Sequence, residues 1–160
     1  MSIQPGDKIP AATVFEMGPE GPGPLSTEDL FGGKTVVVFG LPGAFTPTCS
    51  AQHLPGYIQL SDQLKAKGVD DIVCLSVNDA FVMAAWGQDQ NVDGKVRMIA
   101  DGAAELTKKL GLDLDLSGGG MGVRSDRYAM IVKDGVVESL DREEPKQFEV
   151  SSAAAQLSKL

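Results

Sequence analysis

The sequence predicts an α/β fold in which a mixed sheet is flanked by helices. Three apolar runs typical of strands are each followed by a stretch typical of a helix, and strands joined through helices run parallel in a shared sheet. Closer to the C-terminus, two further apolar runs flank Asp134-Gly135, a dipeptide that favours a tight antiparallel hairpin. Parallel and antiparallel pairs in one sheet make that sheet mixed.

The expected elements follow one another without an internal repeat or a linker, so we expect a single domain over residues 1–160. A Pro- and Gly-rich N-terminal extension precedes the three strand–helix units, and the Gly-rich residues 113–125 are expected to be a loop. This order is that of a thioredoxin-like fold with an insertion. We expect strands at 13–15, 35–39, 72–77, 96–99, 128–132 and 136–140, and helices at 26–30, 47–67, 80–89, 103–110 and 152–160.

Length and charge limit the classes of function. A chain of 160 residues can bury a core without disulfides or metals. Its net charge of −8 disfavours nucleic acid and anionic membranes as partners. No apolar run approaches the roughly 20 residues of a membrane-spanning helix, and the first ten residues do not resemble a secretory signal. Two cysteines make no disulfide framework, so we expect a cytoplasmic protein with reduced thiols.

Cys49 carries the clearest chemical signal in the chain. It follows a predicted strand, a short loop and Thr46-Pro47, a good N-cap before a favoured first helical residue. Unpaired backbone N–H groups and the helix dipole at that position favour a thiolate, which is the reactive form of cysteine. Position 46 holds threonine instead of a second cysteine, so a dithiol motif is absent and a hydroxyl is free to bind a peroxide oxygen. A structural cysteine beside a capping threonine is the alternative.

Several runs of the chain resemble a known family. Residues 42–49, Pro-Gly-Ala-Phe-Thr-Pro-Thr-Cys, resemble the Pro-x-x-x-Thr-x-x-Cys signature of the peroxiredoxins. Residues 49–56, 74–81, 94–97 and 127–130 are similar to the type II, or atypical, subgroup. The resemblance implies a thioredoxin-like fold with a peroxiredoxin-type insertion. It also implies a thiol peroxidase that reduces hydrogen peroxide and small organic hydroperoxides without a cofactor or metal.

The resemblance gives four residues a role in this chemistry. Cys49 would attack the peroxide and become a sulfenic acid, Thr46 would hydrogen-bond the peroxide, and Pro42 would shield the thiolate from water. Arg127 would hold the thiolate and the leaving oxygen, a role that suits a permanently charged, fork-shaped guanidinium. Arg124 is the competing candidate, but it lies in the Gly-rich segment, where a solvated charge is expected.

Cys74 is the other cysteine, in the middle of the predicted strand 72–77. Some type II relatives are proposed to use a cysteine at this spacing to resolve the sulfenic acid. Cys74 is expected roughly 10 Å from the end of its strand, at about 3.3 Å per residue, whereas a disulfide needs Cα atoms within about 7 Å. We therefore favour a buried structural role. An external thiol is then needed, and the family suggests glutaredoxin with glutathione first and thioredoxin second.

Three further residues carry weaker signals. His53, the only histidine, lies one helical turn after Cys49, where it could tune the thiolate, although a local structural hydrogen bond is favoured. Pro55 is expected to kink the helix. Phe45 lies in the reactive loop, and the resemblance implies that this loop joins a homodimer contact.

Two alternative functions stay open: a thiol–disulfide or glutathione-transfer enzyme, and a non-catalytic redox-sensing or chaperone-like binding protein that uses the same cysteine.

Overall fold

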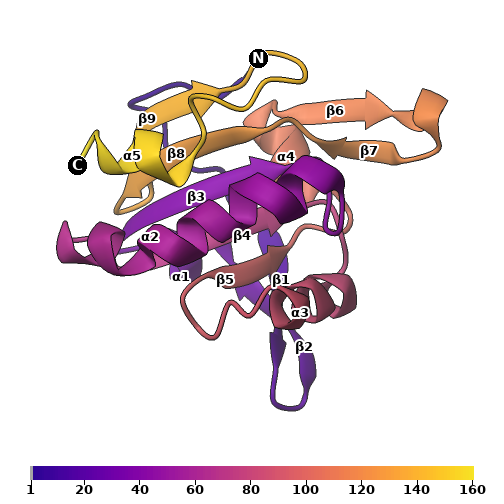
Figure 1. The fold of residues 1–160 in the computed structure, drawn as a ribbon, viewed down its shortest axis with the longest axis horizontal. Helices are drawn as coiled ribbons and strands as arrows, with labels where there is room; N and C mark the ends of the chain where they lie inside the picture. The colour runs from indigo at the N-terminus through magenta and orange to yellow at the C-terminus, as the bar shows by residue number, and fades with distance from the viewer. Residues whose placement is uncertain (1) are drawn as a thin grey trace.

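Seven strands of the computed structural model, which describes residues 2–160, form one mixed sheet in the order β2-β1-β5-β4-β3-β8-β9 (Figure 1). The central pairs β3–β4 and β4–β5 are parallel, and all other pairs of this sheet are antiparallel. The predicted thioredoxin-like fold with a mixed central sheet is confirmed. The strands are β1 (Thr13–Gly18), β2 (Gly21–Ser26), β3 (Thr35–Leu41), β4 (Asp71–Ser76), β5 (Arg97–Ala100), β8 (Tyr128–Lys133) and β9 (Val136–Arg142).

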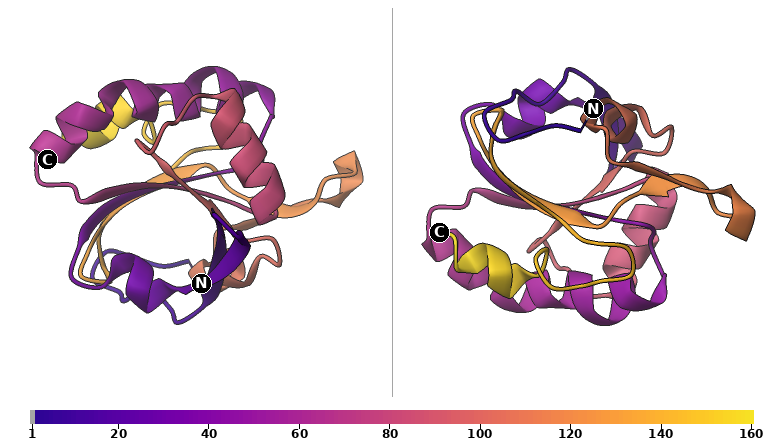
Figure 2. Two further views of the ribbon diagram at one scale, coloured as in Figure 1. Left: turned by 90° about the horizontal axis from the view of Figure 1, so that it is seen from below. Right: turned by 90° about the horizontal axis from the view of Figure 1, so that it is seen from above.

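Helices cover both faces of this sheet (Figure 2). Alternate residues of β3 point to opposite faces, as the pleat requires: Val37 and Phe39 join one buried apolar cluster, and Val36 and Val38 join the other. The first cluster packs against η1, α2, α3 and α5, and the second against α1 and α4. The helices are α1 (Thr27–Phe31), the π-turn η1 (Cys49–His53), α2 (Leu54–Ala66), α3 (Ala80–Asp89), α4 (Glu105–Leu110) and α5 (Ala153–Leu157).

Two segments that looked irregular in the sequence are extended. Residues 113–125 were expected to be a loop, but they form a two-stranded hairpin of β6 (Asp113–Leu116) and β7 (Gly122–Ser125), joined by the short 3₁₀ turn η2 (Ser117–Gly119). This hairpin projects from the body of the molecule (Figures 1 and 2). The Pro-rich stretch before α1 forms β2, which tolerates proline because it is the edge strand of the sheet.

The helix that carries the reactive cysteine begins at Pro47, as expected, but it widens at once into a π-turn. The Leu54 N–H donates to the Cys49 carbonyl, five residues back in the chain, instead of four. Pro55 has no N–H to donate, so the kink predicted at this residue appears as a wide turn directly before it. The turn brings the side chains of Cys49 and His53 into the buried interior.

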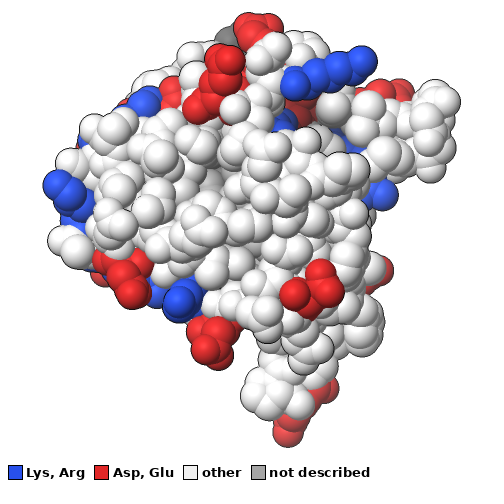
Figure 3. Space-filling model, viewed as in Figure 1, with Lys and Arg blue, Asp and Glu red and all other residues white. Residues whose placement is uncertain are grey.

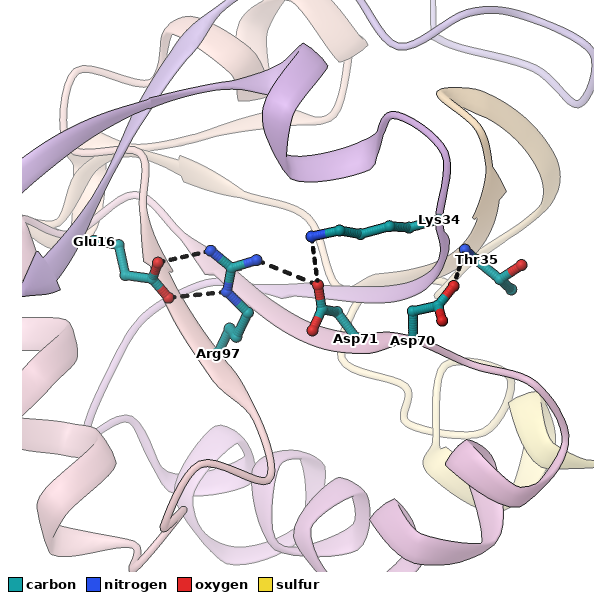
Figure 4. Close-up of polar contacts among 6 residues, drawn as sticks. All are labelled: Glu16, Lys34, Thr35, Asp70, Asp71 and Arg97. Carbon is teal, nitrogen blue, oxygen red and sulfur yellow. Dashed lines mark hydrogen bonds and ion pairs between the residues drawn. The ribbon is translucent and has the colours of Figure 1, made fainter.

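A network of charged side chains joins the amino ends of the parallel strands (Figure 4). Arg97 makes two hydrogen bonds to the Glu16 carboxylate, of 2.7 Å and 3.0 Å, and lies 3.3 Å from Asp71. Lys34 lies 3.2 Å from the same Asp71 oxygen. The network ties β1, β4 and β5 to the residue before β3, at the opposite end of the strands from the loop that carries the thiol.

Figure 3 shows how the charged residues are distributed on one face of the molecule. On the face shown in Figure 3, lysine and arginine side chains lie mainly near the outline and form no continuous basic area. Between residues 2 and 160, no helix combines the length and apolar character that crossing a bilayer requires.

Candidate active site

The site begins where β3 ends, in the loop 42–46. The Ala44 N–H of this loop donates to the Asn78 side-chain oxygen at 3.0 Å, and the Ser76 hydroxyl donates to the same oxygen at 2.6 Å. The loop after β4 therefore holds the loop after β3. Phe45 adopts a left-handed backbone conformation (φ 64°) with its ring half-exposed, which turns the chain into the helix that starts at Pro47.

The sulfur of Cys49 is buried and accepts a hydrogen bond of 3.2 Å from Arg127 Nη2. The register of the sheet explains this contact. Gly40 of β3 pairs with Tyr128 of the antiparallel β8, so the preceding residue, Arg127, lies beside the end of β3 where the reactive loop begins. Gly40 is needed there, because a Cβ on it would lie 2.2 Å from the Tyr128 ring. Strand register thus brings together two residues that are far apart in the sequence.

Thr46 starts the helix through its backbone, because its carbonyl accepts the Ser50 N–H at 2.9 Å. The hydrogen bonding of its hydroxyl differs from the expectation. It donates to the Gly43 carbonyl at 2.7 Å, and within residues 2–160 no backbone N–H donates to it, so the predicted side-chain cap does not form. The hydroxyl oxygen keeps its acceptor capacity for a ligand. Pro42 lines the cavity that opens beside Arg127.

Arg124 occupies a different place from the solvated one that we expected. It belongs to β7 and is half-buried, and its Nε donates to the Met121 carbonyl at 3.0 Å. Its Nη1 lies 3.5 Å from the Pro42 carbonyl oxygen, and a Cβ on Gly43 would lie 2.8 Å from this nitrogen. Arg124 therefore supports the backbone of the reactive loop, whereas Arg127 contacts the sulfur.

His53 belongs to the site, although the sequence favoured a local structural hydrogen bond over a role in tuning the thiolate. Its Nδ1 lies 2.8 Å from Arg127 Nη1, and its Nε2 lies 3.1 Å from the Ser151 carbonyl oxygen. A guanidinium only donates and a carbonyl only accepts, so Nδ1 is the acceptor and Nε2 carries the proton. Burial, and then the charge of Arg127, lower the pKa of His53 to about 3, against a weaker opposing effect of the Ser151 hydrogen bond. The imidazole is neutral.

Cys74 lies in β4 opposite Phe39 and is buried in the same apolar cluster as Cys49. Both cysteines are free thiols. Burial raises the pKa of the Cys74 thiol well above its usual range, the nearby Cys49 raises it further, and Arg127 opposes both. Because the thiolate is the nucleophile of disulfide chemistry, this environment disfavours a nucleophilic role for Cys74.

A cavity of about 840 Å³ leads to Arg127 from the surface. Its lining includes Pro42 and Gln52, Leu114 and Leu116 of the projecting hairpin, and residues of the segment 143–148. The hairpin that the sequence did not predict therefore forms a wall of the site. In the part of the chain that the structure describes, no three His, Cys, Asp or Glu side chains gather as a metal site would require.

A buried thiol held by a guanidinium at the start of a helix, at the end of a central strand, defines a redox-active thioredoxin-like protein. Residues 4–157 match the Redoxin family model. The chain is 46% identical over 164 residues to "Peroxiredoxin-2E, chloroplastic" of Arabidopsis thaliana, covering 99% of this chain and 70% of the relative. It is 47% identical to Arabidopsis thaliana "Peroxiredoxin-2B", with 94% of each chain covered. The reduced Prx3 of Vibrio vulnificus in complex with hydrogen peroxide superposes with a TM-score of 0.95, at 55% identity and with 98% of each chain covered.

The chain therefore belongs to the redoxin family and, within it, to the peroxiredoxins of the type II subgroup. The resemblance drawn from the sequence motifs is confirmed, and with it the class of activity: the protein is a thiol-dependent peroxidase.

Proposed function

We propose that Cys49 is the residue of this peroxidase that reacts with the peroxide, and that the enzyme reduces hydrogen peroxide and small organic hydroperoxides. The observation that carries the assignment is the 3.2 Å hydrogen bond from Arg127 Nη2 to the Cys49 sulfur. A lone pair of the thiolate forms the new S–O bond while the O–O bond breaks. The sulfur becomes a sulfenic acid, and the leaving oxygen takes a proton from solvent and departs as water or an alcohol.

Three neighbouring groups assist this step in the proposed mechanism. Arg127 stabilises the thiolate and then the negative charge that develops on the leaving oxygen, an electrostatic effect worth several kcal/mol in buried sites. Thr46 offers its hydroxyl oxygen to the peroxide proton, since its own proton is used by the Gly43 carbonyl. Pro42 lines the approach to Arg127 and limits access of water. The cavity is larger than hydrogen peroxide needs, which supports organic hydroperoxides as further substrates.

Regeneration of Cys49 proceeds through an external thiol in this proposal. Glutathione attacks the sulfenic acid to give a mixed disulfide and water, and glutaredoxin or a second glutathione then releases the Cys49 thiol. The burial of Cys74 and its raised pKa support external resolution. Thioredoxin is the second candidate reductant. A dithiol exchange activity is disfavoured because Thr46 stands where its second cysteine would be.

Peroxide consumption with excess glutathione and glutaredoxin tests this function. We expect many turnovers per molecule of enzyme and none in Cys49→Ser. Consumption of a single equivalent would instead support the redox-sensing or chaperone-like alternative. The mass of the peroxide-treated protein tests resolution: a sulfenic acid or glutathione adduct supports the external route, and the loss of two hydrogens would show a Cys49–Cys74 disulfide.

A homodimer and a cytoplasmic location complete the proposal. Phe45 of the reactive loop and Phe81 of α3 are 52% and 66% exposed, and a subunit contact that covers them would remove their apolar surface from water. Sedimentation of the protein tests the dimer. A mass that stays that of a monomer at assay concentrations would contradict it.

A further inference from the structure

We propose that His53 is a positioning residue for the peroxidase reaction: as a neutral acceptor it holds the Arg127 guanidinium against the Cys49 sulfur. The segment 143–151 holds the imidazole in turn. This inference rests on the proposed role of Cys49 and Arg127, and it adds a residue that touches neither the sulfur nor the peroxide.

The two terminal nitrogens of Arg127 bind different partners. Nη1 donates to His53 Nδ1 at 2.8 Å, and Nη2 donates to the Cys49 sulfur at 3.2 Å. Since a guanidinium is planar and rigid, fixing one nitrogen fixes the direction of the other. A free arginine side chain has about 2 kcal/mol of rotamer entropy to lose. The His53 contact orders the side chain before the peroxide arrives.

The imidazole ring of His53 is itself immobilised by its neighbours. Its ring lies between aromatic neighbours, with centroid distances of 4.9 Å to Phe39 and 5.1 Å to Phe148. Its Nε2–H donates to the Ser151 carbonyl, which also accepts the Tyr57 hydroxyl at 2.7 Å. Tyr57 stacks on Phe39 at 4.0 Å. The acceptor atom Nδ1 therefore has one direction available, and it faces Arg127.

The Ser151 carbonyl that holds His53 is positioned in turn by Glu143. One oxygen of the Glu143 carboxylate accepts the Ser151 N–H at 2.8 Å, the Ser151 hydroxyl at 2.7 Å and the Glu149 N–H at 2.8 Å. The Glu143 N–H donates to the Arg127 carbonyl at 2.9 Å. The hydrogen bonds thus form a closed path that starts at the Arg127 backbone and returns to its guanidinium through Glu143, Ser151 and His53.

The protonation state of His53 agrees with this role. An imidazolium would donate from both nitrogens and would repel the neighbouring guanidinium. Burial and Arg127 lower the pKa of His53 to about 3, so the ring stays a neutral acceptor at every pH at which a peroxidase would work. The cation–π contact of Phe148 with Arg127, at 5.9 Å from ring centroid to Cζ, covers the guanidinium on the cavity side.

Three substitutions of His53 separate positioning from packing. In His53→Asn the amide oxygen lies the same number of bonds from Cβ as Nδ1, so it can still accept from Arg127 while the Ser151 bond is lost. His53→Leu fills the space without an acceptor, and His53→Phe is a second such variant that keeps an aromatic ring should the leucine protein not fold. The readout is the second-order rate of oxidation by hydrogen peroxide, followed in stopped flow through Trp86, the only tryptophan, whose N–H donates to Ser50 beside Cys49.

We expect His53→Leu and His53→Phe to oxidise on the order of 10- to 100-fold more slowly, the effect of displacing a catalytic group by about 1 Å. His53→Asn should stay within about threefold of the wild type. If His53 had only a structural role, the oxidation rate of each variant would instead follow its thermal stability. An acceptor at position 53 would then make no difference among the three variants. Rates equal to the wild type in the leucine or phenylalanine variant would overturn the proposal.

A double-mutant cycle with Arg127 gives the decisive control. If His53 acts through Arg127, then His53→Leu should change the rate by less than about twofold in an Arg127→Ala background. An undiminished loss in that background would overturn the inference but leave the role of Cys49 intact. If the wild-type protein itself is not oxidised at Cys49, the proposed function fails instead, so the two failures are distinguishable.

Discussion

Replacing Arg127 by methionine tests the electrostatic contribution to peroxide reduction. Methionine resembles the aliphatic part of arginine but removes the charge and both hydrogen bonds, at 3.2 Å to the Cys49 sulfur and 2.8 Å to His53. A charge-assisted hydrogen bond contributes about 1.5–3 kcal/mol, and loss of one donor to a developing oxyanion costs about 2.7–4 kcal/mol. At 1.36 kcal/mol per factor of ten, we expect oxidation to slow by about 10²- to 10³-fold.

Stopped-flow oxidation at several peroxide concentrations measures this second-order rate. The matched control is Arg124→Met, which removes an equal charge from the same region but only contacts to the Met121 and Pro42 carbonyls. We expect Arg124→Met to lose less than about fivefold by loosening the loop. A rate for Arg127→Met within threefold of the wild type, or a larger loss in Arg124→Met, would refute the assignment of the guanidinium.

Four further predictions follow from the geometry. Cys49→Ser should abolish turnover with glutathione and glutaredoxin, whereas Cys74→Ser should keep at least half of it, and equal losses would overturn external resolution. Tyr128→Phe should leave the free energy of unfolding unchanged or raise it by about 1–3 kcal/mol, because this buried hydroxyl has no partner among residues 2–160; a clear loss in urea unfolding would contradict this. Arg97→Met should lower the free energy of unfolding by about 1 kcal/mol, since the network is partly exposed, and should not change the oxidation rate. The pKa of His53 is about 3 in the folded protein, while the unfolded chain protonates it near pH 6.5, so its contribution to stability should fall by about 1.4 kcal/mol per pH unit as pH drops from 6.5 towards 3. In urea unfolding, the free energy of unfolding of the wild type should fall with this slope relative to that of His53→Leu, and a constant difference between the two proteins would contradict it.

Elements with a local signal could be predicted from the sequence. The apolar runs of β3, β4 and β8 and the helix start at Pro47 follow from short-range chemistry, and so does the position of Cys49 on the first helical turn. Arg127 came from a motif match, and the reason it reaches the sulfur is the register of β3 and β8, which no local pattern encodes.

The features that were missed depend on contacts between distant parts of the chain. The hairpin of β6 and β7 is only partly buried and rich in glycine and aspartate, so its sequence has the composition of a loop. β2 is extended because it pairs with β1, despite its prolines. His53 gains its role from Arg127, the residue before β8, and from Ser151, in the segment before α5. Its spacing from Cys49 indicated only a shared helix face.

The oxidation site of the protein treated with one equivalent of hydrogen peroxide shows whether Cys49 is the sulfur that reacts with the peroxide. Trapping of sulfenic acid with dimedone, followed by peptide mass spectrometry, locates the oxidised sulfur. The account predicts an adduct on Cys49 in the wild type and in Cys74→Ser, and no adduct in Cys49→Ser. An adduct on Cys74, or an unmodified Cys49 after the peroxide has been consumed, would contradict it.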